Sequence, residues 1–160
     1  MSHLVELTMY QISQLFLLPT LVLIAALFLY AFWVLGEFLV LALRRKSGKG
    51  RPLLAHFIRQ PRLSDDELDV FAHKLLENQR IASRVTPMLG LVATMIPMGP
   101  ALKSLSDGNL ADVSHNLTIA FSAVILALIA ASITYWAVNV RRRWLAEELL
   151  EIQALRGENA

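Results

Sequence analysis

Two long stretches without a charged residue limit the folds that this chain can adopt. Residues 15–36 form an uncharged run of 22 residues, and residues 117–140 form a second run of 24. At 1.5 Å per residue, a helix of either length crosses the roughly 30 Å of hydrocarbon in a bilayer. A soluble core containing two such runs would be exceptional in a chain of 160 residues. We therefore predict an all-α membrane protein.

The distribution of positive charge indicates a third span. Residues 85–102 are apolar but shorter and contain three prolines. Short loops rich in Lys and Arg stay on the cytoplasmic side of a membrane. If 85–102 also crosses, fourteen of the fifteen Lys and Arg residues lie on one side, with only Lys103 on the other. We predict three transmembrane helices in the inner membrane, with the N-terminus outside and the C-terminus in the cytoplasm.

This topology divides the chain into seven segments. They are an outer N-terminal segment (1–14), a first transmembrane helix (15–43), a cytoplasmic linker and helix (44–84), a second transmembrane helix (85–102), an outer loop (103–116), a third transmembrane helix (117–140) and a cytoplasmic C-terminal helix (141–160).

The second and third spans are predicted to extend into the cytoplasm as helices. Ser64 with Glu67 three residues later forms a capping box, and the helix that begins there is expected to run through Arg84 into the second span. After the third span, Leu145, Leu149 and Ile152 repeat at helical spacing and are expected to pack against residues 64–84. The last five residues, RGENA, are predicted to fray.

The stretch TPMLGLVAT, residues 86–94, carries small and hydroxyl side chains at helical spacing. Thr86, Gly90 and Thr94 lie on adjoining turns, and small residues at this spacing let two helices approach closely. Pro87, Pro97 and Pro100 are expected to shape the same helix. Each lacks an N–H, so Pro97 and Pro100 deprive the carbonyls of Ala93 and Ile96 of their usual donors. Inside a membrane those carbonyls need protein, water or an ion.

Hydroxyls are the main polar groups of the second and third spans: Thr86, Thr94, Thr118, Ser122, Ser132 and Thr134. A hydroxyl can order a water chain or solvate a carboxylate. It can equally bond to a carbonyl of its own helix. We favour the second interpretation for Ser132 and Thr134, and both remain open for Thr94.

Glu37 is an ionisable residue within the first span, which makes it a candidate functional group. It lies seven residues before Arg44, about 10 Å along a helix axis. It can therefore reach the inner headgroup layer or pair with a basic residue there, and we favour this interpretation. Arg44 and Arg141 are the expected basic residues of that inner interface.

Other kinds of function lack a signal in the sequence. We find no nucleophile triad, phosphate loop, cofactor motif or cluster of metal ligands, so we expect a non-enzymatic protein without cofactor or metal. The chain contains no Cys, which leaves no disulfide or thiolate chemistry. Its net charge of +2 follows from the topology, so the expected contacts are membrane lipid and other proteins, and no nucleic acid.

The motif TPMLGLVAT, the polar outer loop and the small-residue third helix resemble the MotA/TolQ/ExbB proton-channel family, and specifically its three-helix TolQ and ExbB branch. Thr86, Pro87, Gly90, Leu91 and Thr94 match the family motif, whereas Ala93 replaces a glycine. In the third helix, Val124 stands at the position of the family's hydroxyl, and Ser122 lies two residues away. The short cytoplasmic linker suggests a minimal or divergent member.

The resemblance implies a ring of subunits, five in number, around two copies of a single-span partner of the ExbD, TolR or MotB type. The partner carries the ion-binding Asp, and ion flow, expected to be of protons, drives a motor that transduces energy for work such as protein transport in the envelope. Thr94 is then the expected ion-path residue, assisted by Ser122 and Thr118. An alternative is a non-conducting scaffold that only holds a partner helix. A less favoured alternative is a channel without a partner, for which Glu37 is the available carboxylate.

Overall fold

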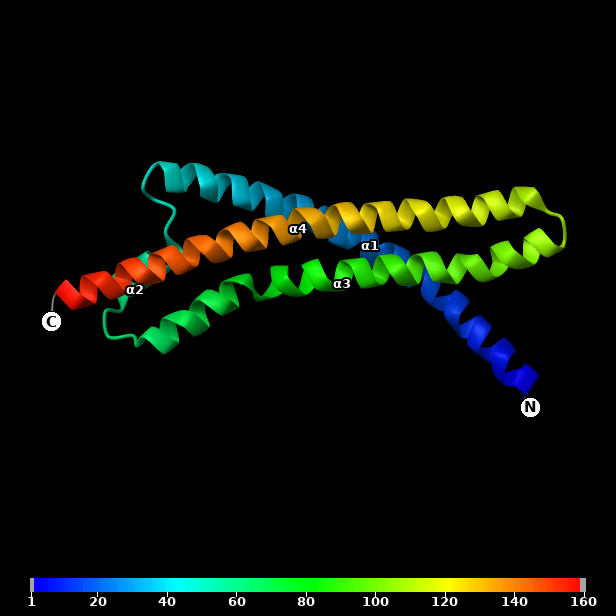
Figure 1. Cartoon of the computed structure of the whole chain (residues 1–160), viewed down its shortest axis with the longest axis horizontal. Helices are drawn as coiled ribbons and strands as arrows, with labels where there is room; N and C mark the ends of the chain where they lie inside the picture. The colour runs from blue at the N-terminus through cyan, green and yellow to red at the C-terminus, as the bar shows by residue number, and fades with distance from the viewer. Residues whose placement is uncertain (1, 159–160) are drawn as a thin grey trace. The chain divides into compact units, whose positions relative to one another are not determined.

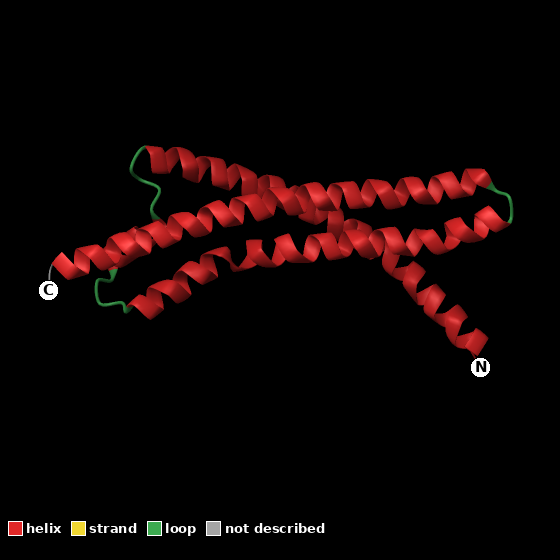
Figure 2. Ribbon diagram, in the orientation of Figure 1, coloured by secondary structure: helices red, strands yellow, loops and turns green. Residues whose placement is uncertain are grey.

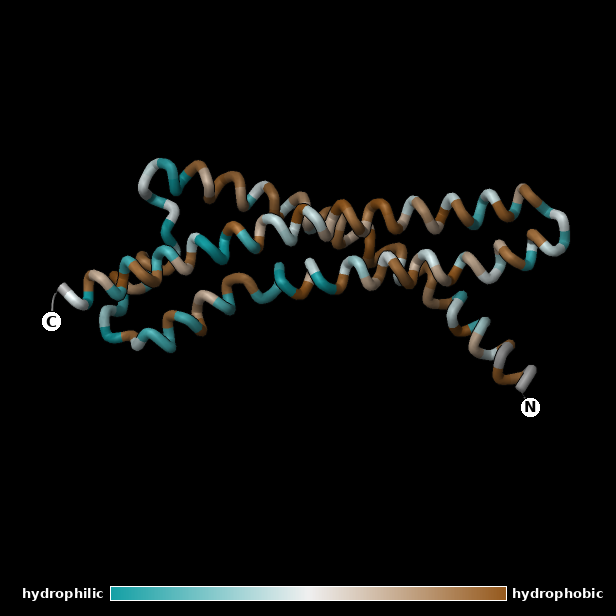
Figure 3. Tube along the Cα trace, in the orientation of Figure 1, coloured by the Kyte–Doolittle hydropathy of each residue, from teal (hydrophilic) through white to brown (hydrophobic). Residues whose placement is uncertain are grey.

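The computed structural model describes residues 2–158, which form four helices: α1 (Ser2–Lys46), α2 (Pro52–Arg59), α3 (Asp65–Ser106) and α4 (Leu110–Glu158) (Figure 1). No strand occurs among these residues, as Figure 2 shows. α1, α3 and α4 are each long and apolar enough to cross a membrane, and their apolar stretches are visible in Figure 3. The predicted all-α chain with three apolar helices is confirmed. Residue 1 and residues 159–160 of the predicted terminal segments lie outside the described residues.

Most of the segment predicted as the outer loop, residues 103–116, is helical. α3 continues to Ser106 and α4 begins at Leu110, so only residues 107–109 lie outside helices. Gly108 has a φ of 74°, a left-handed conformation that favours glycine. The Asn109 N–H donates to the Ser104 carbonyl at 2.9 Å, and the Asn109 Oδ1 accepts from the Asp112 N–H at 3.3 Å. These bonds end one helix and cap the next, so the polar residues on either side remain helical.

The long helices are continuous where the sequence suggested separate segments. α1 starts at Ser2 and passes Pro19 without a break, so the predicted outer segment 1–14 is helical from residue 2. α3 runs from Asp65 through all three of its prolines, as predicted. The capping box is also confirmed: the Ser64 N–H donates to the Glu67 carboxylate at 2.8 Å, and the Glu67 N–H donates to the Ser64 hydroxyl at 3.2 Å.

The chain divides into two compact units, which we describe separately. The first unit comprises residues 2–31 and 83–132, and the second comprises residues 32–82 and 133–158. In the first unit, one apolar cluster joins α1, α3 and α4 through the buried residues Ile24, Ala93, Ala123 and Ala127. Three of these four are alanines, so the helices pack with little side-chain volume between them.

The second unit has a larger apolar core, made of the buried residues Leu53, Leu68, Leu76, Leu145 and Ile152. It joins α2, the start of α3 and the end of α4. The predicted packing of the C-terminal helix against residues 64–84 is therefore confirmed. The predicted frayed tail is wrong for residues 156–158, which are helical. The Arg156 guanidinium donates to the Asp65 carboxylate and to the Leu63 carbonyl, and these contacts hold the last turn.

Glu148 is the most buried charged side chain of the second unit, with 1% of its surface exposed. Its Oε2 accepts from the Leu53 N–H at 2.9 Å and from the Leu54 N–H at 3.3 Å, and its Oε1 accepts from Arg45 at 2.8 Å. Leu53 and Leu54 lie in the first turn of α2, which starts at Pro52. The carboxylate of α4 thus caps α2 and pairs with the end of α1. The sequence analysis missed this role, because Glu148 is one of three Glu residues in a run that resembles a solvated helix.

Candidate ion path

α3 and α4 approach each other closely at Gly90 in the first unit. A Cβ added at Gly90 would lie 2.9 Å from the Ala127 Cβ and 3.5 Å from a methyl carbon of Val124. A 2.9 Å approach leaves no space for a methyl group, so the contact requires glycine on α3. The predicted close-packing face of residues 86–94 is confirmed at this position. Val124, which the resemblance predicts at the position of the family's hydroxyl, contacts α3 here.

Thr94 lies one turn beyond Gly90 on α3 and is half-buried. Its hydroxyl donates to the Leu91 carbonyl at 2.7 Å. This is the helix-internal bond that the sequence analysis kept as an alternative to a role in an ion path. The bond uses the single donor of the hydroxyl but leaves its oxygen able to accept from a water molecule or a protonated carboxyl group.

The two hydroxyls of α4 that were predicted to assist the ion path are exposed. Thr118 and Ser122 are four residues apart and both exposed, and the Thr118 hydroxyl donates to the Ser114 carbonyl at 2.8 Å. Among residues 2–158, no hydrogen bond joins either of them to Thr94. Ala93 directly precedes Thr94, and Ala123 directly follows Ser122. Both alanines belong to the buried apolar cluster of the first unit. The two helices therefore pack at the level of these hydroxyls without a direct bond between them.

Ser132 adopts the structural role that the sequence analysis favoured for it. Its hydroxyl donates to the Leu128 carbonyl of its own helix at 2.7 Å. The neighbouring small residues Ala123, Ala127, Ala130 and Ala131 are all buried. The predicted close-packing stripe of the third apolar helix is therefore confirmed at these alanines.

One of the carbonyls released by the prolines of α3 has a protein partner. The Gln14 side chain donates to the Ile96 carbonyl at 3.2 Å, in place of the N–H that Pro100 lacks. Tyr10, one turn earlier on α1, lies 3.6 Å from where a Cβ at Gly99 would stand. The N-terminal turns of α1 thus pack against the proline-containing end of α3. The sequence analysis predicted the need for a partner but did not identify Gln14, whose only signal is an amide next to an apolar run.

Replacing Gln14 by Leu is expected to lower the stability of the protein in detergent by about 1 kcal/mol, because the Ile96 carbonyl loses its donor. Gln11 is exposed on the same helix, so Gln11→Leu is the matched control and should leave stability unchanged. Thermal unfolding followed by circular dichroism measures both variants. Equal midpoints for the two would mean that the Gln14 bond contributes nothing.

Glu37 forms an ion pair in the second unit rather than remaining isolated. Its carboxylate lies 3.0 Å from the Arg141 guanidinium, as the favoured interpretation predicted. Phe38 beside it stacks on Trp144, with ring centroids 5.2 Å apart, and meets Trp136 edge to face at 4.8 Å. The third predicted interface residue, Arg44, is exposed. Glu37 and Arg141 therefore serve to hold α1 against α4.

The family model described as the MotA/TolQ/ExbB proton channel family matches residues 66–154. This match covers more than half of the chain and includes nearly all of α3 and most of α4. The chain belongs to this family. The predicted resemblance is confirmed, and the match contains Gly90, Thr94, Thr118 and Ser122 but neither Gln14 nor Glu37.

Membership of the proton channel family and three apolar helices identify a multi-pass membrane protein with a channel-type role. Comparisons with curated proteins and with solved structures gave no significant match. Within residues 2–158, no group of three or more His, Asp or Glu side chains is placed to hold a metal ion.

Proposed function

We propose that this family member is a ring-forming subunit of an ion-driven motor complex of the inner membrane. Its role is transport rather than enzymatic, and the ion is the proton. The N-terminus lies outside, and α3 and α4 extend from the membrane into the cytoplasm. Five copies surround two copies of a single-span partner, and the energy of proton flow performs work in the envelope.

The observation that carries the proposal is the kind of polar group found on α3 and α4. Residues 85–102 and 117–140 contain hydroxyls but no Asp or Glu. A protein that couples proton flow to work uses a group that binds and releases the proton, and a hydroxyl does not titrate near neutral pH. A partner helix that supplies an Asp completes the path, because a hydroxyl such as Thr94 can then accept from the protonated carboxyl or rotate to donate to the carboxylate.

The subunit composition tests this proposal first. Native mass spectrometry of the detergent-purified complex, expressed with and without the neighbouring reading frames, should give a closed ring of about five copies that retains a single-span protein bearing an Asp. Closed cyclic assembly is the usual outcome when one face of a subunit binds a different face of the next. A monomer or dimer that retains no such protein would contradict the proposal.

Replacing Thr94 by Val is expected to slow proton uptake by about 10- to 100-fold, because a hydrogen bond to a charged group is worth about 1.5–3 kcal/mol. Uptake is measured with a pH-sensitive dye in proteoliposomes that contain the subunit together with its partner. Thr94→Ser should retain most of the activity. Ser132→Ala is the matched control, since the Ser132 hydroxyl makes the same kind of helix-internal bond as that of Thr94 but is not a predicted ion-path residue.

The alternative is a membrane scaffold that does not conduct, for which the alanine packing of α4 is the supporting observation. A scaffold would tolerate the near-isosteric change at Thr94, since the size of the side chain is retained. Normal proton uptake or envelope function in the Thr94→Val variant, with the ring intact, would favour the scaffold.

A further inference from the structure

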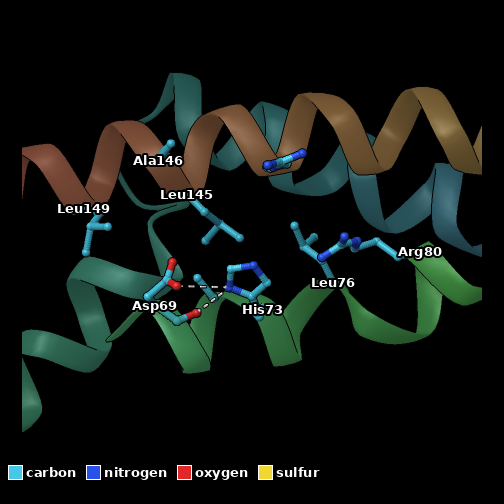
Figure 4. Close-up of a pocket in the computed structure, with 9 residues that line it drawn as sticks. Asp69, His73, Leu76, Arg80, Leu145, Ala146 and Leu149 are labelled. Carbon is cyan, nitrogen blue, oxygen red and sulfur yellow. Dashed lines mark hydrogen bonds and ion pairs between the residues drawn. The ribbon is translucent and has the colours of Figure 1, made fainter. Parts of the chain in front are cut away.

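A cleft of about 200 Å³ lies between α3 and α4 in the second unit. Figure 4 shows Leu145, His73 and Leu76 in its middle, Arg80 at one end and Leu149 at the other. The cleft is also lined by Arg142 of α4. The family match and the proposed motor give this cleft no role, and none of the predicted site residues lines it.

Two arginines from different helices meet at the same end of the cleft. Leu76 and Leu145 belong to one buried cluster, which places these two positions side by side. Arg80 is one turn from Leu76 along α3, and Arg142 is about one turn from Leu145 along α4, which runs the opposite way. Both steps lead in the same direction, toward the apolar parts of the helices. The two arginines therefore line the same part of the cleft.

The charge that lines this end of the cleft is positive. Asp69 is the one acidic residue among the nine that line the cleft, and it lies on the side of His73 away from Arg80, with its carboxylate 3.4 Å from the His73 Nδ1. The same ring nitrogen is 2.9 Å from the Asp69 carbonyl. Two like charges in one cleft repel each other, so an anion between them would be stabilised by both. Arginine pairs with phosphate oxygens through two parallel N–H donors.

The position of the two arginines along their helices indicates that the anion is a lipid headgroup. Arg80 lies five residues before the apolar segment 85–102, and Arg142 lies two residues after the segment 117–140. These separations correspond to about 8 Å and about 3 Å along a helix axis. The headgroup layer on each side of a bilayer is roughly 5–8 Å thick. The backbone positions of both arginines thus fall within the headgroup layer, which contains the lipid phosphates.

We propose that Arg80 and Arg142 bind the phosphate of an anionic phospholipid at the α3–α4 cleft of the second unit. The lipid comes from the leaflet that borders the basic side of the chain. This inference requires that α3 and α4 cross the membrane, but it does not depend on a motor function. Lipid bound at this site would make the position of these two helices depend on the lipid composition around them.

Lipid binding is tested on the full chain purified in uncharged detergent. Native mass spectrometry after addition of phosphatidylglycerol or phosphatidylcholine, at equal concentrations, measures the fraction of protein that retains lipid. We expect preferential retention of phosphatidylglycerol. Arg142→Gln and Arg80→Gln should each weaken it about fivefold, the effect of one basic residue near an anionic membrane surface.

Arg143→Gln is the matched control. Arg143 neighbours Arg142 at nearly the same depth and is exposed, but it does not line the cleft. Equal loss of lipid in Arg142→Gln and Arg143→Gln would overturn the proposal, as would equal retention of the two lipids by the unmodified protein. Displacement of the lipid by millimolar inorganic phosphate would also overturn it, since the site would then take free phosphate.

A second measurement keeps the test decisive if a Gln variant unfolds. Phosphatidylglycerol with a photoreactive group near its phosphate should crosslink to residues 76–80 and 142–146, which mass spectrometry of peptides can locate. Crosslinks confined to other basic segments would contradict the proposed site. Arg142→Lys, which retains the charge, should keep most of the crosslinking.

Discussion

Replacing Glu148 by Ala is expected to destabilise the protein by about 3–5 kcal/mol, the usual cost of removing one partner of a buried ion pair. The variant would leave the Arg45 guanidinium without its 2.8 Å partner and the buried Leu53 N–H without its 2.9 Å acceptor. In a chain of this size, that loss should lower the thermal midpoint in detergent by about 10 °C or more. Hydrogen exchange should show early loss of protection in α2.

Glu147 provides the control for this prediction, because it lies next to Glu148 and also pairs with Arg45, at 2.9 Å. Its side chain is 54% exposed, whereas that of Glu148 is 1% exposed. An exposed ion pair contributes about 0–1 kcal/mol, so Glu147→Ala should change the midpoint little. Glu148→Gln, which keeps one acceptor oxygen, should fall between the two. Equal effects of Glu147→Ala and Glu148→Ala would contradict the assigned capping role.

Gly90→Ala is expected to weaken the contact between α3 and α4 in the first unit. The added methyl group would lie 2.9 Å from the Ala127 Cβ, and Ala127 has no flexible side chain that could move aside. Overpacking of this kind costs about 1–3 kcal/mol. This cost exceeds the roughly 0.5–1 kcal/mol that alanine contributes over glycine inside a helix. A lower thermal midpoint and a smaller fraction of assembled protein on size-exclusion chromatography are the expected results.

Two further variants distinguish the effect of overpacking at Gly90 from the general effect of replacing glycine by alanine in a helix. Gly36 lies in the apolar part of α1, and a Cβ added there would meet no atom within 4 Å, so Gly36→Ala should be neutral or slightly stabilising. Ala127→Gly removes the methyl group opposite Gly90 and should restore part of the stability lost by Gly90→Ala. Failure of this rescue would mean that Gly90 is required for another reason, such as backbone flexibility beside Pro87.

The candidate site was only partly predictable from sequence. Thr94 was recognisable because a motif surrounds it, and motifs preserve the spacing of residues along one helix. Whether its hydroxyl faces a path or its own backbone depends on a side-chain torsion, which no motif encodes. Gln14 and Ile96 are 82 residues apart, so their bond follows from the way α1 crosses α3, which is a tertiary property.

The helical class, the three apolar helices, the start of α3 at its capping box and the family all followed from the amino-acid sequence. These properties depend on hydropathy, helical periodicity and residues within four positions of one another, which are local in the chain. Which polar groups are buried depends instead on how the helices pack. Glu147 and Glu148 look alike in sequence, but helical rotation of about 100° per residue turns only Glu148 inward, to the first turn of α2. How far α3 and α4 continue on either side of the turn at residues 107–109 was also decided only in the folded chain, since capping bonds allowed polar residues to remain helical.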